Sequence, residues 1–298
     1  MANDDNSVLA YYAKSGFMTD PGRHAAAFGA MPRDIAALCE IVQGLLLHIF
    51  WAPAYGFKPP TEREDEVQLR SVAEMLDRAL VIDPQALTVA RPPARRLLGN
   101  CRHFSTLVCA ILRHQGVPAR ARCGFGAYFN RGTFEDHWVC EYWNHRQGRW
   151  TLVDAQLDAK QRQILNLPFD PLDVPRDQFI VAGRGWTACR RGESDPMLYG
   201  IFDMRGLWFI RGNVVRDIAS LNRVELLPWD GWGLMAKKDS ESGAEDTALL
   251  DRCAALSTSG NEAFGDLRQI YEDPRLRVPR VIDSFRLNGV EKIELPGI

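Results

Sequence analysis

The first long hydrophobic pattern in the chain lies between residues 32 and 50. Apolar side chains recur there every three or four residues, which places them on one face of an α-helix: Ile35, Leu38, Val42, Leu45, Leu46 and Ile49. Pro32 suits the first turn of this helix. A second helix is predicted over about 67–80, because the acidic residues before it favour the positive end of a helix dipole. Residues 1–30 show no such pattern and are expected to be irregular.

A third helix is predicted to begin near Cys101. Gly99 and Asn100 are favourable residues at a helix start, and Gly116 and Pro118 end the pattern. The apolar face of this helix carries Cys101, Phe104, Val108, Ile111 and Leu112, with Leu107 beside it. Cys101 is therefore expected in the first turn of a helix whose body is buried.

Strands follow this helix, and then the pattern changes again. Three segments rich in aromatic and β-branched residues are predicted as strands, at 119–128, 137–143 and 149–154. Beyond residue 160, helices are predicted at 176–190, 212–226, 246–256 and 261–271. The polar segment 237–246 is expected to be an exposed linker. Helices, then strands, then helices indicate an α+β fold rather than alternating βαβ units.

Composition limits the possible partners. The 298 residues are 46% hydrophobic and 25% charged, as in ordinary globular proteins, and the formal net charge is −2. Such a balance builds no broad positive field, so no nucleic-acid partner is expected. The N-terminus lacks the basic and apolar regions of a secretory signal, and the longest apolar runs are too short to cross a bilayer. The chain is therefore expected to be soluble, without a membrane partner.

Seven cysteines are scattered along the chain, an odd number without any CxxC pair. This arrangement is no disulfide framework, and it fits a reducing cytoplasm. The cysteine and histidine spacings around residues 101–123 match no familiar zinc module, so neither a metal nor another cofactor is expected.

Cys101 is the first residue with candidate chemistry. The thiolate is the reactive form of cysteine, and the positive end of a helix dipole lowers a thiol pKa by favouring negative charge. The free amides of a helix N-terminus can also stabilise an oxyanion. Position alone leaves the other reading open, in which Cys101 is a buried structural thiol.

His137 and Asp154 provide the second candidate feature. If the hairpin loop comprises Asn144–Gln147, Trp143 faces Gly148 and His137 lies directly opposite Asp154, with Cβ atoms ~5 Å apart. A carboxylate beside a histidine fixes its tautomer and stabilises the imidazolium. The two residues could instead merely cap a hairpin edge. Together with a cysteine at a helix N-terminus, they favour a catalytic arrangement of nucleophile, base and orienting group.

At these residues the sequence resembles a known family. The segments GNCRHFSTLVCAILRHQGVPARARCGFG, DHWVCEYW and RWTLVDAQLD resemble the core of transglutaminase-like proteins, which use a papain-like Cys-His-Asp triad. The resemblance covers about residues 97–158 and carries the triad onto Cys101, His137 and Asp154. It implies a papain-like core in which a cysteine helix packs on an antiparallel sheet. We expect one elaborated domain over 1–298, with this core at about 90–160 and helical additions at 30–85 and 160–275.

The sequence also departs from the family pattern. Many relatives carry an acidic residue two positions after the cysteine, where this chain has His103. No acidic cluster resembles the calcium sites of animal transglutaminases, so calcium control is not expected. Some family members have lost the triad and only bind, whereas this chain retains all three residues.

Three further residues are candidates for oxyanion or substrate contacts. Asn100 could donate a hydrogen bond from its side chain, although helix capping is the commoner role. His103 could tune the site, although such a residue is more often a partly exposed polar neighbour. Trp138 could line a substrate cleft, although large aromatic residues are mostly core.

These features predict an enzyme that attacks amide, peptide or ester bonds through a thioester, most simply as a hydrolase. The expected substrate is a peptide, a protein or a small amide or ester. Two alternatives stay open: acyl transfer to an amine, as in transglutaminases, and a binding module or scaffold that reuses the fold without catalysis.

Overall fold

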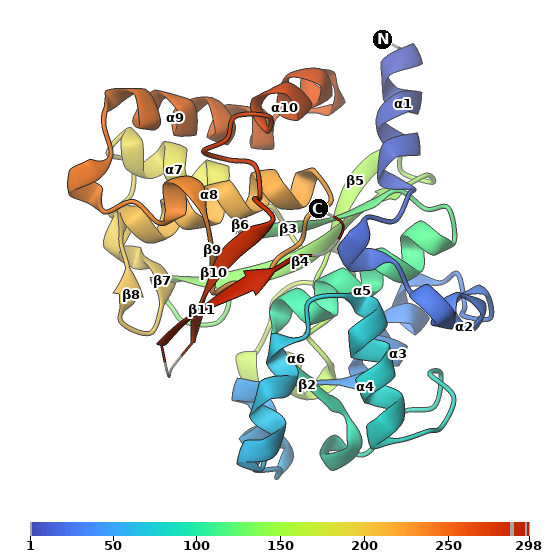
Figure 1. The fold of residues 1–298 in the computed structure, drawn as a ribbon. Helices are drawn as coiled ribbons and strands as arrows, with labels where there is room; N and C mark the ends of the chain where they lie inside the picture. The colour runs from blue at the N-terminus through green and yellow to red at the C-terminus, as the bar shows by residue number, and fades with distance from the viewer. Residues whose placement is uncertain (1, 287–288, 296, 298) are drawn as a thin grey trace. The chain divides into compact units, whose positions relative to one another are not determined.

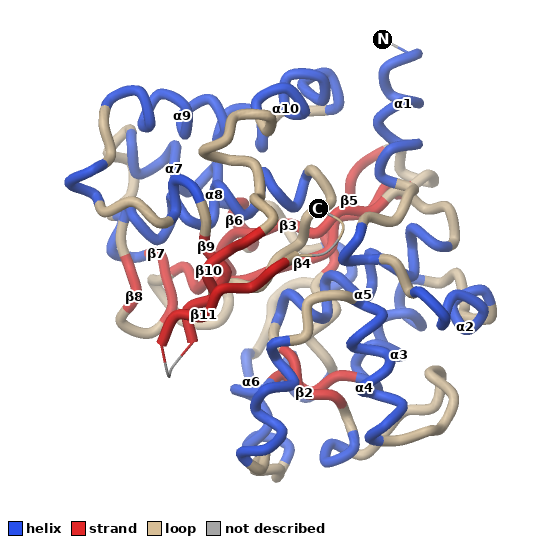
Figure 2. Tube along the Cα trace, viewed as in Figure 1, coloured by secondary structure: helices blue, strands red, loops and turns tan. Residues whose placement is uncertain are grey.

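The computed structural model describes residues 2–286, 289–295 and 297 (Figures 1 and 2). Helices and strands are mixed without regular alternation, so the predicted α+β class is confirmed. The chain divides into two compact units. The first unit comprises Met1–Val8, Arg122–His137 and Pro175–Ile298, and the second comprises Leu9–Ala121 and Trp138–Val174.

Helix α5 (Cys101–His114) forms the centre of the second unit. Every residue from Cys101 to Arg113 is buried, which confirms the predicted apolar face and extends burial around the whole helix. Within this unit α5 contacts α2 (Ala25–Gly29), α3 (Ile35–Leu45) and α4 (Val72–Ile82), as Figure 1 shows. A helix covered on all sides is held in place by packing, so its first residue is well positioned.

The two helices predicted before Cys101 have different boundaries in the structure. The helix expected over 32–50 ends at Leu45, because β1 (Leu46–His48) pairs in parallel with β2 (Leu97–Gly99). The helix expected over 67–80 begins at Val72, because Ser71 caps it: the Ser71 Oγ accepts a hydrogen bond from the backbone N–H of Glu74 at 3.2 Å.

The three predicted strands are confirmed as β3 (Ala119–Gly126), β4 (Phe134–Asn144) and β5 (Arg149–Val153). The boundaries between the two units fall inside β3 and β4. In the second unit β4 pairs with β5 in antiparallel orientation. In the first unit β3 pairs with β6 (Phe179–Val181), and β4 pairs in parallel with β7 (Tyr199–Ile201).

Three helices pack on one another in the first unit. These are α7 (Ala182–Arg190), α8 (Leu207–Leu221) and α9 (Ala244–Thr258). The predicted helix at 176–190 starts late because residues 179–181 join the sheet, and the one at 212–226 starts five residues early, at Leu207. The helix predicted at 246–256 is confirmed as α9.

The segment 237–246 is largely exposed but is more than a linker. Its last residues already belong to α9, and the Lys237 ammonium pairs with the Asp246 carboxylate at 2.6 Å. The Arg211 guanidinium of α8 donates a hydrogen bond to the Ser242 hydroxyl at 2.9 Å. The first contact joins the segment to α9, and the second attaches it to α8.

Several elements were not predicted. Residues 1–30 contain α1 (Ala2–Tyr12) and α2, where the sequence indicated irregular structure. The helix expected at 261–271 is a 3₁₀ turn followed by α10 (Phe264–Ile270). The remaining elements are α6 (Ala159–Leu165), β8 (Met204–Arg205), β9 (Asp230–Gly231), β10 (Val281–Arg286) and β11 (Gly289–Glu294). Within the described part of the chain, no helix has both the length and the apolar character that a membrane span requires.

Candidate active site

Cys101 is the first residue of α5, as predicted. Asn100 precedes it in an extended conformation, and the Asn100 Oδ1 accepts a hydrogen bond from the backbone N–H of Arg102 at 3.0 Å. The Cys101 residue is 6% exposed. The thiol therefore belongs to the first residue of a 14-residue helix, at the end where the backbone N–H groups are free of intrahelical partners.

The Asn100 side-chain nitrogen differs from the oxygen in its contacts. Asn100 is 5% exposed, and its Nδ2 has no hydrogen-bond partner among the described residues. A buried amide donor without a partner costs free energy unless a ligand or water meets it. The Asn100 Nδ2 is thus a buried donor without a partner on the residue that precedes Cys101.

The prediction that His103 is a partly exposed neighbour was wrong. Its side chain is fully buried, and its Nδ1 accepts a hydrogen bond from the backbone N–H of Asn100 at 3.1 Å. Burial, followed by the charge of Arg102, lowers the pKa of His103 well below its ordinary value, so the ring is neutral. His103 thus completes a capping box, a position where Glu or Gln is usual.

Replacing His103 with glutamine should flatten the pH dependence of stability. Below about pH 6.5 the unfolded chain binds a proton at position 103 that the folded chain excludes, so the free energy of unfolding falls with decreasing pH by up to about 1.4 kcal/mol per unit. A glutamine can still accept the capping hydrogen bond but does not titrate. Urea unfolding of both proteins between pH 6 and 4.5 measures the difference in slope. Equal slopes would show that His103 is not held neutral.

Asp154 directly follows β5 in the second unit. It is 1% exposed, and its backbone N–H donates a hydrogen bond to the Pro171 carbonyl at 2.8 Å. The Asp154 Oδ1 accepts a hydrogen bond from the backbone N–H of Gln156 at 3.1 Å, which forms an Asx turn. Burial, and then the Asp154 charge, raise the pKa of Cys39 to about 12. The carboxylate is therefore fixed by local backbone contacts, and its charge is felt by a neighbouring helix.

His137 lies on β4 and is the last residue of the first unit. It is 2% exposed, and its ring contacts three aromatic rings edge-on: Phe129 at 4.8 Å, Tyr128 at 5.9 Å and Phe179 at 6.3 Å between centroids. The imidazole is therefore buried among aromatic rings of the first unit and largely shielded from water.

Two acidic residues precede His137. Burial raises the pKa of both Glu135 and Asp136. The Asp136 carboxylate accepts a hydrogen bond from the Asn213 side chain of α8 at 2.7 Å, so it serves a structural role in the first unit. The Glu135 side chain contacts Asn130. Neither acidic residue belongs to a solvated loop.

The predicted hairpin register was wrong by two residues. Trp143 lies opposite Trp150 rather than Gly148, and Asn144 lies opposite Arg149, so the loop comprises residues 145–148. The Asn144 Oδ1 accepts hydrogen bonds from the backbone N–H groups of Arg146 and Gln147, which places the start of the turn after Asn144. Gly148 ends it with φ 61°, a left-handed conformation that favours glycine. The predicted position of His137 directly opposite Asp154 is therefore wrong, because the last pair of the ladder joins Cys140 to Val153 and Asp154 follows the end of β5.

Residues 69–155 match the family model of the transglutaminase-like superfamily. The resemblance predicted for this part of the chain is confirmed. A solved structure from Cytophaga hutchinsonii, described as that of a candidate cysteine protease, is similar with 15% sequence identity and a TM-score of 0.33. The likeness covers 57% of this chain and 44% of that one. No curated protein matches the chain.

The transglutaminase-like match contains all three predicted triad residues. It begins just before α4 and ends one residue after Asp154, so it includes α5 and strands β3 to β5. The match extends the resemblance seen in the sequence upstream, from residue 97 to residue 69. Cys101 and Asp154 belong to the second unit and His137 to the first.

Trp138 is a core residue, as is usual for large aromatic side chains. It is 1% exposed, and along the strand it alternates with His137, so the two side chains leave β4 on opposite faces. Among the residues that the structure describes, no group of three or more His, Cys, Asp or Glu side chains is arranged to hold a metal ion. The matched segment 69–155 contains a thiol, an imidazole, a carboxylate and an amide among its candidate residues, on Cys101, His137, Asp154 and Asn100.

Proposed function

We propose that the chain is a cysteine-nucleophile enzyme that cleaves amide, peptide or ester bonds through a thioester intermediate. The observation that carries the proposal is the placement of Cys101 at the capped N-terminus of α5, inside the transglutaminase-like match. His137 and Asp154 are proposed as its base and orienting group. Both are buried and held by local contacts, as pre-organised catalytic groups are.

The proposed reaction has two halves. His137 takes the proton from the Cys101 thiol, and the thiolate forms a bond to the substrate carbonyl carbon. The resulting oxyanion accepts hydrogen bonds from the backbone N–H of Cys101 and from the Asn100 Nδ2. The tetrahedral intermediate then breaks the bond to the leaving amine or alcohol, which takes the proton from His137, and a thioester remains.

The second half restores the enzyme. His137 takes a proton from water, the hydroxide oxygen bonds to the thioester carbon, and the carbon–sulfur bond breaks to release the acid. The thiolate regains its proton from His137. An amine in place of water would yield a new amide, as in a transglutaminase. We favour water because nothing specific in the chain argues for an amine site.

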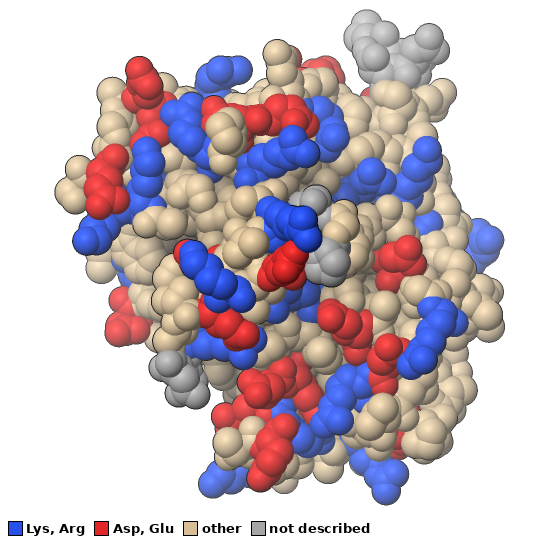
Figure 3. Space-filling model, in the orientation of Figure 1, with Lys and Arg blue, Asp and Glu red and all other residues tan. Residues whose placement is uncertain are grey.

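The substrate class is proposed from the site's chemistry. A thioester mechanism requires an acyl donor, so a peptide, a protein or a small amide or ester is expected. Acidic and basic side chains are interspersed over the face seen in Figure 3, without a broad area of either sign. On this face the charges provide no strong electrostatic selection for a highly charged partner.

The rate of Cys101 alkylation as a function of pH tests whether this thiol forms a thiolate more readily than a free cysteine. The account predicts an inflection well below the free-thiol pKa of about 8.5. Cys189 is an internal control, since it is more exposed than Cys101 and burial raises its pKa to about 11. Site-resolved mass spectrometry monitors the two alkylation rates. If Cys101 reacts faster than Cys189 at pH 6, the result supports the proposal. An ordinary inflection at Cys101 would favour a binding module on the same fold.

A further inference from the structure

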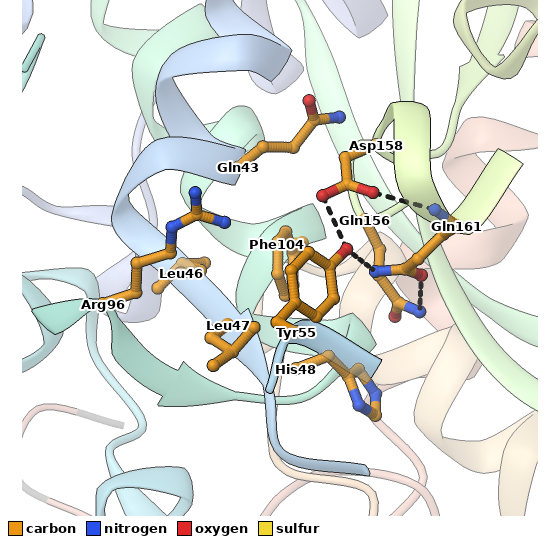
Figure 4. Close-up of a pocket in the computed structure, with 10 residues that line it drawn as sticks. All are labelled: Gln43, Leu46, Leu47, His48, Tyr55, Arg96, Phe104, Gln156, Asp158 and Gln161. Carbon is orange, nitrogen blue, oxygen red and sulfur yellow. Dashed lines mark hydrogen bonds between the residues drawn. The ribbon is translucent and has the colours of Figure 1, made fainter. Parts of the chain in front are cut away.

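A chain of hydrogen bonds leads from the half-buried Tyr55 to the buried turn that holds Asp154. The Tyr55 hydroxyl donates to the Asp158 Oδ2 at 2.6 Å and accepts from the Gln161 Nε2 at 3.3 Å. The Gln161 Oε1 accepts in turn from the Gln156 Nε2 at 3.1 Å. Figure 4 shows Tyr55 meeting side chains of residues 156–161 in the second unit, at a hollow whose wall also includes Phe104 of α5.

The direction of each hydrogen bond in this chain is fixed. Burial, and then the hydrogen bond to Asp158, raise the pKa of Tyr55, so its hydroxyl keeps the proton that it donates. The Tyr55 oxygen can therefore only accept from the Gln161 amide, and this orients the Gln161 carbonyl toward Gln156. Asp158 also caps α6 by accepting from the Gln161 backbone N–H at 2.9 Å.

The chain ends on the turn that holds Asp154. Gln156 is 2% exposed, and its backbone N–H donates to the Asp154 Oδ1 at 3.1 Å. Ala155, between Asp154 and Gln156, is held by α3. The Gln43 Nε2 of α3 donates a hydrogen bond to the Ala155 carbonyl at 3.1 Å. Contacts with α3, α6 and Tyr55 thus determine where residues 154–156 lie.

We propose that Gln161 and Tyr55 are positioning residues for Asp154, acting through the side chain and backbone of Gln156. The inference rests on the proposed function, in which Asp154 orients His137. Without the Gln161 amide, Gln156 loses the contact that fixes its side chain, and the Asx turn holding the carboxylate loosens. A carboxylate displaced by even 1 Å supports the imidazolium less well. When the protonated His137 ring is less stabilised, the thiolate–imidazolium pair is less favourable, and the Cys101 thiolate forms at a higher pH.

Other titratable groups surround this region and remain unchanged by the test. Cys39 of α3 interacts with the Asp154 charge, and Asp158 with Arg96. His48 also lines the hollow. A variant that changes only an amide or a hydroxyl therefore leaves every charge around Asp154 in place.

The experiment compares Gln161→Met with Gln163→Met. Both substitutions lie on α6 and remove the same amide, but Gln163 is exposed and lies outside the chain of hydrogen bonds. We expect the inflection of Cys101 alkylation to rise by about one pH unit in Gln161→Met, which lowers the rate about tenfold below the inflection. Gln163→Met should match the wild type. Tyr55→Phe removes only the hydroxyl and should shift the inflection in the same direction.

The outcomes separate the inference from the proposed function. A low inflection in the wild type that is unchanged in Gln161→Met and Tyr55→Phe would overturn the positioning role and leave the triad intact. An ordinary inflection in the wild type would overturn the proposed function and the inference together. A purely structural role predicts a lower melting temperature without a shift in the pH profile. If Gln161→Met does not fold, Tyr55→Phe decides alone.

Discussion

Replacing Asp217 with alanine should lower the free energy of unfolding by about 3–5 kcal/mol. Asp217 on α8 and Arg122 on β3 form a buried ion pair in the first unit, at 2.9 Å, with both side chains at most 2% exposed. The Asp217 Oδ1 also accepts from the backbone N–H of Cys123 at 2.9 Å. Removal of the carboxylate would leave a buried cation and a buried N–H without this partner, which is why the cost is large.

Urea unfolding of the variant measures this cost. Glu272→Ala is the control, because the Glu272–Arg277 pair is about 60% exposed on both sides and should contribute under about 1 kcal/mol. Equal losses in the two variants would contradict the importance of the buried pair. A large loss only in Asp217→Ala would show that α8 and β3 depend on it.

Replacing His137 with alanine should slow alkylation of Cys101 at pH 7 by at least about tenfold. In the proposed triad the His137 imidazolium stabilises the Cys101 thiolate, and its removal would leave a thiolate fraction nearer that of a free thiol, about 3% at pH 7 for a pKa of about 8.5. The reaction of Cys189 should not change, since no imidazole contributes to its raised pKa.

His145→Ala provides the matched control for this prediction. His145 lies in the exposed loop of the β4–β5 hairpin, so its removal takes away a histidine without changing the buried face of the strand. A rate unchanged in His137→Ala would remove His137 from the proposed triad. A comparable loss in both histidine variants would point to a general effect on folding, which circular dichroism of the two proteins would reveal.

Local patterns predicted the part of the fold that carries the candidate site. The periodicity after Cys101, with Asn100 as cap and Gly116 as stop, was enough to place α5 to within a residue at its start. Aromatic and β-branched runs located β3, β4 and β5 for the same reason, since each strand's signal lies within its own residues. The triad residues themselves stay a prediction.

Contacts between distant residues account for most of what the sequence did not reveal. Leu46–His48 continue the apolar run of α3, and only their pairing with Leu97–Gly99 makes them a strand. The hydrogen bond between Tyr55 and Gln161 joins residues 106 positions apart, so no local pattern signals it. The hairpin register depended on a side chain, Asn144, whose Asx turn selects where the loop begins.

The burial of His103 shows a different limit. A histidine two residues after a helix start reads as polar surface, and burial on every side of α5 became evident only from the helices packed around it. Its neutral ring then takes the capping role usually filled by Glu or Gln. A polar residue within a helix start can therefore signal a cap as well as a surface.

Direct trapping of the acyl-enzyme tests the central claim. The protein is mixed with p-nitrophenyl acetate, quenched in acid and mapped by mass spectrometry, with Cys101→Ala in parallel and with an added primary amine in a third sample. The account predicts an acetyl group on Cys101 that hydroxylamine removes, release of acetate even when amine is present, and no such adduct in the variant. An unmodified Cys101, or acetylation no greater than at Cys189, would contradict it.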